Sequence, residues 1–473
     1  MLSLFPTADD SRRMSRRQWL RLGALSSSGL AGAGLFGGAR RLTGSASHRA
    51  SAKNCISIFL CGGPSQPDLW DLKLDAPEGI RSEFSPLQTN VPGIVFSELI
   101  PTVAKHADKL ALIRSLTHAD NSHVNAIVHT LYGQKMPQPG DLYTARHDHP
   151  GVGAILHDVL GTEGELPPWV ILPRPFTTSS PPYKGQSAGF LGAKYDPLLF
   201  DKEKKGSLSD APLTLDAIQP SEGLSADRFT ERRSLLTSLE AGEDALTDVA
   251  FEENYRKAFS LLTSEETRRA FDLEAEPAAV RDRYGRNEYG QSFLMARRLV
   301  ESGVRYVNLF WTFFDGKGCQ FNLWDNHGVD KDVCGIDGQL TGRQQITHDY
   351  CTPSFDRCFP ALLEDLDDRG LLDETLVVVH GEFGRTPKIN KNSGRDHWAH
   401  CYTQLMAGGG VRGGQVYGAS DATGAYVKDS PVTPDDFHAT VLHAFGVSPE
   451  DAVYDPSGRP VRVTTGSPVT ALF

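Results

Sequence analysis

Residues 375–410 read TLVVVHGEFGRTPKINKNSGRDHWAHCYTQLMAGGG, and this stretch decides the fold. The apolar run 376–379 predicts a buried strand, which ends after a histidine in the sequence GEFG at 381–384. Glu382 is therefore expected at the carboxyl end of a core strand. In open α/β sheets this is the edge where ligands bind.

The same stretch brings a second carboxylate and an imidazole about a dozen residues later. The sequence GRDHW at 394–398 places Asp396 and His397 on a predicted loop before another apolar run. Glu, Asp and His delivered by strand-end loops suit a divalent metal or acid/base chemistry. The alternative is a Glu–Arg ion pair beside a loop histidine that bonds to backbone, and this stretch alone favours neither interpretation.

Composition narrows the class of protein. With 473 residues the chain is long enough for one large domain or two, and 39% hydrophobic and 23% charged residues are typical of a globular protein. The formal charge of −11 argues against a nucleic-acid or anionic-membrane surface. After the N-terminal segment, no run approaches the roughly 20 apolar residues that span a bilayer, so no transmembrane span is expected in the mature chain.

Residues 1–52 are interpreted as a twin-arginine export signal and linker. SRRQWL at 15–20 places two arginines before a weakly hydrophobic segment, 22–38, which is rich in Gly, Ala and Ser. The mature protein, residues 53–473, is therefore expected in the periplasm or another extracytoplasmic space. Candidate cleavage sites are Ala50-Ser51-Ala52, Ala39 and Ala46.

The cysteines predict at most one obvious disulfide. Cys319 and Cys334 bracket a loop and are the best candidate pair in an oxidising compartment. Cys351 and Cys358 would lie about 10.5 Å apart along a helix, which is too far for a disulfide. The absence of C-x-x-C disfavours a thiolate zinc site.

Strands and helices alternate along the mature chain. Predicted strands are 54–60, 110–116, 169–172, 304–311 and 376–379. Predicted helices are 124–132, 150–160, 288–302 and 433–446, with a further helical stripe at 355–366 that Pro360 breaks or restarts. This alternation predicts an α/β domain with a mostly parallel central sheet covered by helices on both faces.

Three further segments lie between or after these elements. Residues 173–224 are rich in Pro, Gly, Ser and charge, and we interpret them as a long excursion or lid. Residues 225–274 carry apolar side chains at helical spacing and are expected to form helices that cover the sheet. The tail 448–473 is expected on the surface.

Polar clusters follow the other predicted strands. In CGGPSQPD at 61–68, Gly62 and Gly63 would allow backbone to approach a ligand, although a plain turn is an alternative and the sequence is not a nucleotide-binding loop. After the second strand, His118 and His123 could reach a common site. Asp325 and His327 are two residues apart, and in extended chain such side chains share a side. Because every cluster follows a strand, we expect one active or binding site.

These residues also carry a family resemblance. EDLDDRGLLDETLVVVHGEFGRTP at 364–387, together with GRDHW at 394–398, resembles the domain of unknown function 1501 family. The G-G-P-S-Q-x-D element at 62–68, the W-D-x-H element at 324–327 and the export signal are similar to it as well. The resemblance implies an alkaline phosphatase-like fold, because the family is grouped with the alkaline phosphatase and sulfatase superfamily. Members of that superfamily hydrolyse phosphate or sulfate esters with divalent metal ions held at strand ends.

The chain departs from the superfamily pattern at several positions. A metal-binding Asp usually follows the first strand, where this chain has Cys61 and Gly62, and the S-D-H-G element appears as GEFG at 381–384. Asp325 and His327 resemble the D-x-x-x-H pair at a shorter spacing, and His397 resembles the late histidine. His123 falls where a Thr, Ser or Cys nucleophile is expected, and Ser122 and Ser65 are the nearby hydroxyls.

The resulting hypothesis is an exported, metal-dependent hydrolase of phosphate or sulfate esters, acting on a small-molecule or polysaccharide ester and not on nucleic acid. Its expected metal ligands, for zinc, calcium or another divalent ion, are Asp325, His327, Glu382 and His397. Its expected catalytic residues are Ser65 as a possible nucleophile, His123 as acid/base or ligand, and Arg385 for oxyanion charge. The remaining site residues are Gly62, Gly63, Asp68, Ser122 and Asp396. The alternative is a non-catalytic ligand-binding or cell-envelope protein that kept the fold and lost the chemistry.

Overall fold

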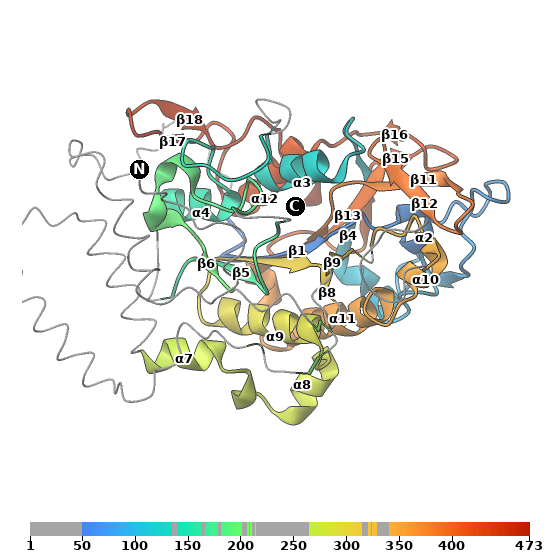
Figure 1. Ribbon diagram of the computed structural model, residues 1–473, viewed down its shortest axis with the longest axis horizontal. Helices are drawn as coiled ribbons and strands as arrows, with labels where there is room; N and C mark the ends of the chain where they lie inside the picture. Colours follow the sequence, from blue (N-terminus) through green and yellow to red (C-terminus); the bar gives the residue numbers. More distant parts are fainter. Residues whose placement is uncertain are drawn as a thin grey trace, which may run out of the picture.

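The computed structural model describes residues 50–134, 141–161, 166–177, 181–200, 206–207, 209–210, 213, 264–314, 320–322, 324–328 and 340–473. A sheet lies at the centre of these residues (Figure 1). It has eight strands in the order β14-β4-β13-β10-β1-β7-β5-β6. Its strands are β1 (Asn54–Leu60), β4 (Leu110–Leu116), β5 (Trp169–Leu172), β6 (Leu198–Leu199), β7 (Tyr306–Trp311), β10 (Thr375–His380), β13 (Tyr402–Ala407) and β14 (Gln415–Tyr417).

Most of the sheet is parallel. β1 lies between β10 and β7 and pairs in parallel with both, and β5 continues the parallel order on to β6. Only β13 runs the other way, antiparallel to both β10 and β4, while β14 is parallel to β4. The predicted mostly parallel α/β sheet is confirmed.

Helices cover both faces of the sheet, as Figure 1 shows. One layer contains α7 (Glu265–Phe271), α8 (Ala278–Tyr284), α9 (Glu288–Glu301) and α11 (Thr352–Asp368). The other contains α3 (His123–Tyr132), α4 (Val152–Leu160) and α12 (Pro434–Ala444). Side chains of β1 alternate between the layers, because Ile56 and Ile58 join the first core while Cys55 and Phe59 join the second. The predicted two-sided covering is confirmed.

Shorter elements surround the sheet. The remaining strands are β2 (Pro86–Gln88), β3 (Val95–Ser97), β8 (Phe313–Phe314), β9 (Gln320–Phe321), β11 (Gly384–Ile389), β12 (Arg395–Trp398), β15 (Ala419–Ser420), β16 (Val427–Asp429), β17 (Ala452–Tyr454) and β18 (Pro460–Arg462). The remaining helices are α2 (Gln66–Leu69), α10 (Gly342–Ile346) and the 3₁₀ turns Val103–Lys109, Gly189–Leu191, Ala193–Tyr195, Leu273–Ala275, Leu372–Glu374 and Thr470–Leu472. None of the helices among the described residues is long and apolar enough to cross a membrane.

Pro360 does not interrupt its helix, contrary to the sequence-based expectation. α11 continues through it as one element of 17 residues. Phe355, Phe359 and Leu362 on this helix are almost completely buried in the first core. Their burial offsets the roughly 3 kcal/mol that an interior proline costs.

The C-terminal tail is mostly exposed or half-buried, as predicted, but a few of its apolar residues also pack into the domain. β17 and β18 pair with each other, and Val453, Val463 and Leu472 are buried in the second core. These apolar residues are spaced too irregularly to show a strand or helix period. The periodicity of apolar residues in the sequence therefore does not predict their burial.

Several sequence predictions concern residues outside the described ranges. These are the twin-arginine motif at 15–20, the pair Cys319 and Cys334, and most of 201–263. Within the predicted excursion, the described residues 181–200 form turns and contribute β6 to the sheet. Cys351 and Cys358 are both free and buried, as their predicted separation required.

The described chain begins within the packed domain. The backbone amides of Ser51 and Ala52 both donate to Ala444 O at 3.0 Å, and Ser51 Oγ donates to Gly409 O at 2.7 Å. Ala52 is 4% exposed. Residues 51 and 52 therefore belong to the fold.

Candidate metal centre at the strand ends

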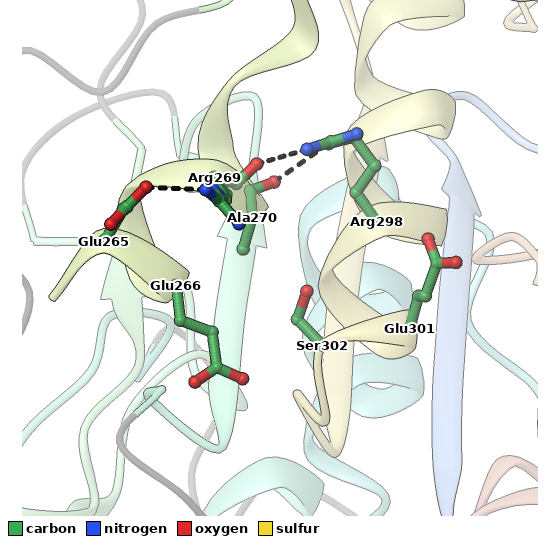
Figure 2. Close-up of a pocket in the computed structure, with 7 residues that line it drawn as sticks. All are labelled: Glu265, Glu266, Arg269, Ala270, Arg298, Glu301 and Ser302. Carbon is green, nitrogen blue, oxygen red and sulfur yellow. Dashed lines mark hydrogen bonds and ion pairs between the residues drawn. The ribbon is translucent and has the colours of Figure 1, made fainter. Parts of the chain in front are cut away.

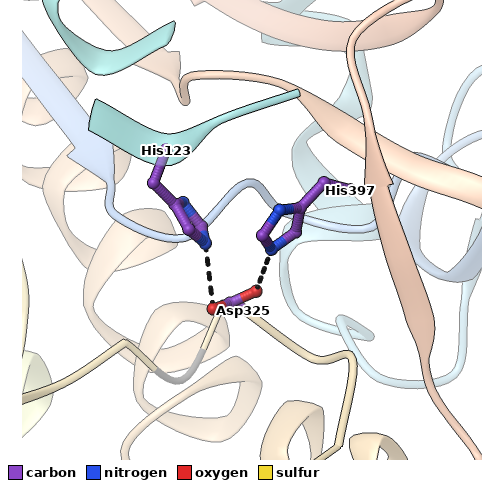
Figure 3. A group of neighbouring side chains, drawn as sticks. All are labelled: His123, Asp325 and His397. Carbon is purple, nitrogen blue, oxygen red and sulfur yellow. Dashed lines mark hydrogen bonds and ion pairs between the residues drawn. The ribbon is translucent and has the colours of Figure 1, made fainter. Parts of the chain in front are cut away.

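Three distant segments bring His123, Asp325 and His397 together (Figure 3). His123 is the first residue of α3, and Asp325 follows β9. His397 was expected on a loop, but it lies on β12, directly opposite Arg385 of β11. This short antiparallel hairpin fixes the direction of the His397 side chain.

The two imidazoles converge on one carboxylate. His123 Nε2 lies 3.0 Å from Asp325 Oδ2, and His397 Nε2 lies 3.0 Å from Asp325 Oδ1. One ligand atom from each of the three residues lies within 4.8 Å of the others. Two imidazole nitrogens and a carboxylate oxygen form a donor set that suits zinc and other transition metals better than calcium, which prefers oxygen ligands.

The other ring nitrogen of each histidine, Nδ1, also forms a hydrogen bond. His123 Nδ1 lies 2.8 Å from Glu382 Oε1, and His397 Nδ1 lies 3.1 Å from Asn121 O. A carboxylate and a carbonyl oxygen only accept hydrogen bonds, so each Nδ1 carries the proton. Each Nε2 lies against the Asp325 carboxylate, and a bound ion would replace the proton there, so that the neutral ring would offer its Nε2 lone pair to the ion.

Glu382 was expected to bind the metal, and the structure places it behind His123 instead. The residue is completely buried. Besides bonding to His123, its Oε1 accepts a hydrogen bond from Gly62 N at 2.9 Å. Its Oε2 has no hydrogen-bond partner among the described residues.

Arg385 was expected to face a substrate oxyanion, but it is enclosed by protein. Its Nε donates to Gly63 O at 2.8 Å and its Nη2 donates to Asp325 Oδ1 at 2.6 Å. Nη2 also donates to Gly62 O, and Nη1 donates to Arg395 O. With no exposed surface, Arg385 holds the Asp325 carboxylate and the Gly62–Gly63 loop in place.

His327 lies beside the cluster as a further imidazole. Its Nε2 is 3.2 Å from Asp325 Oδ2, and its Nδ1 bonds to Gly328 O. The expected extended D-x-H geometry is absent, because residues 324–328 form a turn. The turn nevertheless brings His327 onto the same carboxylate.

Glycines allow the loops of the site to approach closely. Gly62 has φ +122°, and a Cβ built on it would lie 2.5 Å from Asp325 N. A Cβ on Gly394 would lie 2.2 Å from Asn326 O. Gly62 was expected to approach a ligand, but its close neighbour is the backbone that carries Asp325.

Ser65 and Asp68 belong to a separate buried network. Ser65 Oγ donates to Asp68 Oδ2 at 2.7 Å. Arg395 donates to the same carboxylate from Nε at 2.8 Å and from Nη2 at 3.0 Å. Arg395 was not predicted as a site residue. It lies two residues before His397, and residues two apart in a strand share a side, so this spacing could have identified it.

Two other predicted site residues lie at the surface. Ser122 is the exposed residue that precedes α3. Asp396 is also exposed, and its Oδ1 accepts a hydrogen bond from Asn390 Nδ2 at 2.8 Å. As a neighbour of His397 on a strand, Asp396 projects from the opposite face of β12.

The electrostatics of the cluster favour a cation between the carboxylates. Burial alone would lower the pKa of His123, but the charge of Asp325 and the bonds to Asp325 and Glu382 raise it to about 9. Burial would raise the pKa of Asp325, but Arg385 and His123 hold it well below its usual range. Burial lowers the pKa of His397. A proton on His123 therefore occupies a position where positive charge is stabilised.

A cavity elsewhere carries no comparable chemistry. About 470 Å³ lies between α7 and α9, beside charged side chains that Figure 2 shows. Arg269 there pairs with Glu265 at 2.6 Å, and Arg298 is bonded to Glu276 and to backbone carbonyls. No residue of the His123 cluster lines it.

Comparison with known proteins gives a family and a set of loosely similar structures. The family described as "Protein of unknown function (DUF1501)" matches residues 52–473. None of the curated proteins matches the chain.

Three solved structures illustrate the similarity. A protein in the alkaline phosphatase superfamily from Vibrio parahaemolyticus has 9% identity and a TM-score of 0.36, with 92% of this chain and 76% of that chain covered. The PsFucS1 sulfatase from Pseudoalteromonas sp. has 11% identity and a TM-score of 0.37, with 84% and 68% covered. The phosphonate monoester hydrolase SpPMH from Silicibacter pomeroyi has 12% identity and a TM-score of 0.35, with 84% and 73% covered. All three TM-scores are below 0.4.

Proposed function

Because the chain belongs to the DUF1501 family, whose description names no activity, we propose a function from the site: a divalent-metal-dependent hydrolase of phosphoric or sulfuric esters on an alkaline phosphatase-like fold. One observation carries this proposal. The Nε2 atoms of His123 and His397 meet at the carboxylate of Asp325, and each ring is held by a bond from its Nδ1.

The donor atoms fit a metal ion. His123, Asp325 and His397 would hold it. His327 Nε2 lies 3.2 Å from Asp325 Oδ2, but His327 is not part of the group whose ligand atoms all lie within 4.8 Å of one another. Three protein ligands with a position left for water or substrate are typical of catalytic zinc sites. A bound ion would supply positive charge to polarise the ester and stabilise its transition state.

The residues around the ion position have separate tasks. Arg385 and the glycine loop fix Asp325, while Glu382 and Asn121 O orient the two imidazoles. Ser65 is buried and its hydroxyl donates to Asp68. The site therefore favours water over Ser65 as the nucleophile.

We also infer export by the twin-arginine route. The motif SRRQWL at 15–20 supports this inference. Ser51 and Ala52 are bonded to Ala444 and Gly409. A cut after Ala52 would remove these contacts, so cleavage near Ala39 or Ala46 agrees better with the fold.

A second candidate function is a metal- or ligand-binding protein of the cell envelope without catalysis. The observation that favours it is the position of Arg385 and Ser65, whose polar groups are turned to protein partners. The expected oxyanion cation, Arg385, is thus bonded to Asp325 and Gly63, and the expected hydroxyl nucleophile, Ser65, is bonded to Asp68. A small-molecule or polysaccharide ester remains the proposed substrate of the first candidate.

Metal analysis combined with turnover tests both candidates. The purified full-length chain should contain about one equivalent of zinc or another transition metal and hydrolyse members of a panel of aryl phosphates and aryl sulfates. His397→Ala should lose metal and turnover together, while His106→Ala should keep both, because His106 pairs with Glu364 away from the site. Stoichiometric metal without turnover would support the binding protein, and a wild type without metal would reject the metal-dependent hydrolase.

A further inference from the structure

Burial of the Glu382 carboxylate in its present environment is energetically unfavourable. It has no exposed surface, and only its Oε1 is bonded, to Gly62 N and His123 Nδ1. Its Oε2 lacks a hydrogen-bond partner among the described residues. A half-satisfied buried carboxylate destabilises a fold unless positive charge lies nearby.

His123 connects this carboxylate to the ion position. The ring bonds to Glu382 through Nδ1 at 2.8 Å. It reaches Asp325 through Nε2 at 3.0 Å (Figure 3). Positive charge at the cluster is therefore one imidazole away from Glu382. The carboxylate both fixes which nitrogen carries the proton and increases the electron donation of the other.

His397 provides an internal comparison. Its Nδ1 bonds to a neutral acceptor, Asn121 O, at 3.1 Å. Both rings are thus oriented in the same way, but only His123 has a charged acceptor. A neutral acceptor is enough to orient an imidazole. The negative charge of Glu382 therefore has a further effect on the site besides orienting His123.

We propose that Glu382 is a positioning and charge-balancing residue of the metal site, which acts through His123 and does not ligate the ion. Arg385 already neutralises Asp325 in a bond of 2.6 Å, so the three ligand residues alone give a divalent cation little net negative charge. Glu382 supplies the missing negative charge from behind the ligand. This inference rests on the proposed function, since it requires the cluster to bind metal.

Glu382→Gln tests the proposal because it keeps the shape and an acceptor oxygen and removes the charge. Zn²⁺ affinity of the full-length chain, measured by competition with a chromogenic chelator, should fall about 10- to 100-fold. The visible spectrum of the Co²⁺-loaded variant should keep the band pattern of the wild type, because the ligands are unchanged. On a His123→Ala background, Glu382→Gln should cause little further loss, since its effect passes through His123.

Asp356→Asn is the matched control. Asp356 is also a buried carboxylate, and it accepts hydrogen bonds from the amides of Thr102 and Val103, which are not residues of the cluster. Its substitution should lower the melting temperature and leave Zn²⁺ affinity unchanged. If Glu382→Gln does not fold, Glu382→Asp serves instead, because its shorter side chain withdraws the acceptor from His123 and should weaken Zn²⁺ binding.

The outcomes separate this inference from the proposed function. A wild type that binds Zn²⁺ together with a Glu382→Gln chain of equal affinity would overturn the role of Glu382 only. Loss of an oxygen ligand in the X-ray absorption spectrum of the variant would also overturn it, because Glu382 would then be a ligand. A wild type without Zn²⁺ binding would overturn both.

Discussion

Nη2 of Arg385 lies 2.6 Å from Oδ1 of Asp325, and the arginine side chain has no exposed surface. Arg385→Met removes the cation and leaves the carboxylate of Asp325 in a largely buried position. Breaking such a pair from one side costs about 3 to 5 kcal/mol. Urea denaturation with a chelator present should show a loss of this size, and Zn²⁺ should recover part of it by replacing the missing charge.

Arg385→Lys separates charge from geometry in the same experiment. It keeps a cation but cannot reproduce the bonds that Arg385 makes to Gly63 O and Arg395 O. We expect a stability between those of the wild type and Arg385→Met. A loss below about 1 kcal/mol in the methionine variant would contradict the structural role assigned to this pair.

Gly62→Ala should damage the metal site through the backbone of Asp325. The new Cβ would lie 2.5 Å from Asp325 N, so the turn that carries the carboxylate has to move. Gly79→Ala is the matched control, because Gly79 also has positive φ but no atom within 4 Å of the added Cβ. Both variants should lose about 1–2 kcal/mol from backbone strain, and only Gly62→Ala should also bind Zn²⁺ more weakly. Equal Zn²⁺ affinities would show that the clash is relieved elsewhere.

Ser65→Ala distinguishes water from serine as the nucleophile. Ser65 Oγ donates to Asp68, which Arg395 also contacts, so the substitution removes one bond from a buried network. We expect the free energy of unfolding to fall by about 1–2 kcal/mol while kcat stays within about tenfold of the wild type. A loss of turnover by several orders of magnitude, with Zn²⁺ affinity intact, would identify Ser65 as the nucleophile.

The sheet was predictable because its strands are local apolar runs. β1 and β4 begin and end at the residues that the pattern gave, and β10 differs from its prediction by one residue at each end. The direction of β13 was not predictable, because it depends on the β11–β12 hairpin that precedes it. The continuity of α11 through Pro360 likewise depends on burial, which is a property of the packed chain.

The sequence predicted which residues of the candidate site lie near one another, but not the directions of their side chains. The rule that ligands bind at the carboxyl ends of parallel strands placed Asp325 near His397, and the structure puts them 3.0 Å apart. The same rule gives no side-chain direction, so the enclosed position of Arg385 could not be foreseen. Asn121 bonds to His397 through its backbone oxygen. Every residue has such an oxygen, so the residue type does not predict this contact.

Stability should decrease in mild acid because of a buried histidine that is not part of the cluster. Burial lowers the pKa of His438 to about 4, and its Nε2 bonds to Thr130 O. In the unfolded chain this histidine titrates near the ordinary value of about 6.5. Between pH 6.5 and 4 the unfolded state therefore binds a proton that the folded state rejects, and the free energy of unfolding falls as the pH falls.

His438→Gln tests this assignment because glutamine keeps an N–H donor for Thr130 O and does not titrate. Urea denaturation between pH 7 and 4, with a chelator present so that metal release does not contribute, should show a shallower loss of stability in the variant. The difference between the two curves should approach about 3 kcal/mol at pH 4, which is the free energy equivalent of the lowered pKa. The same substitution at His147, whose side chain is 82% exposed, is the control. Parallel curves for wild type and His438→Gln would mean that the acid sensitivity of the fold arises at other groups.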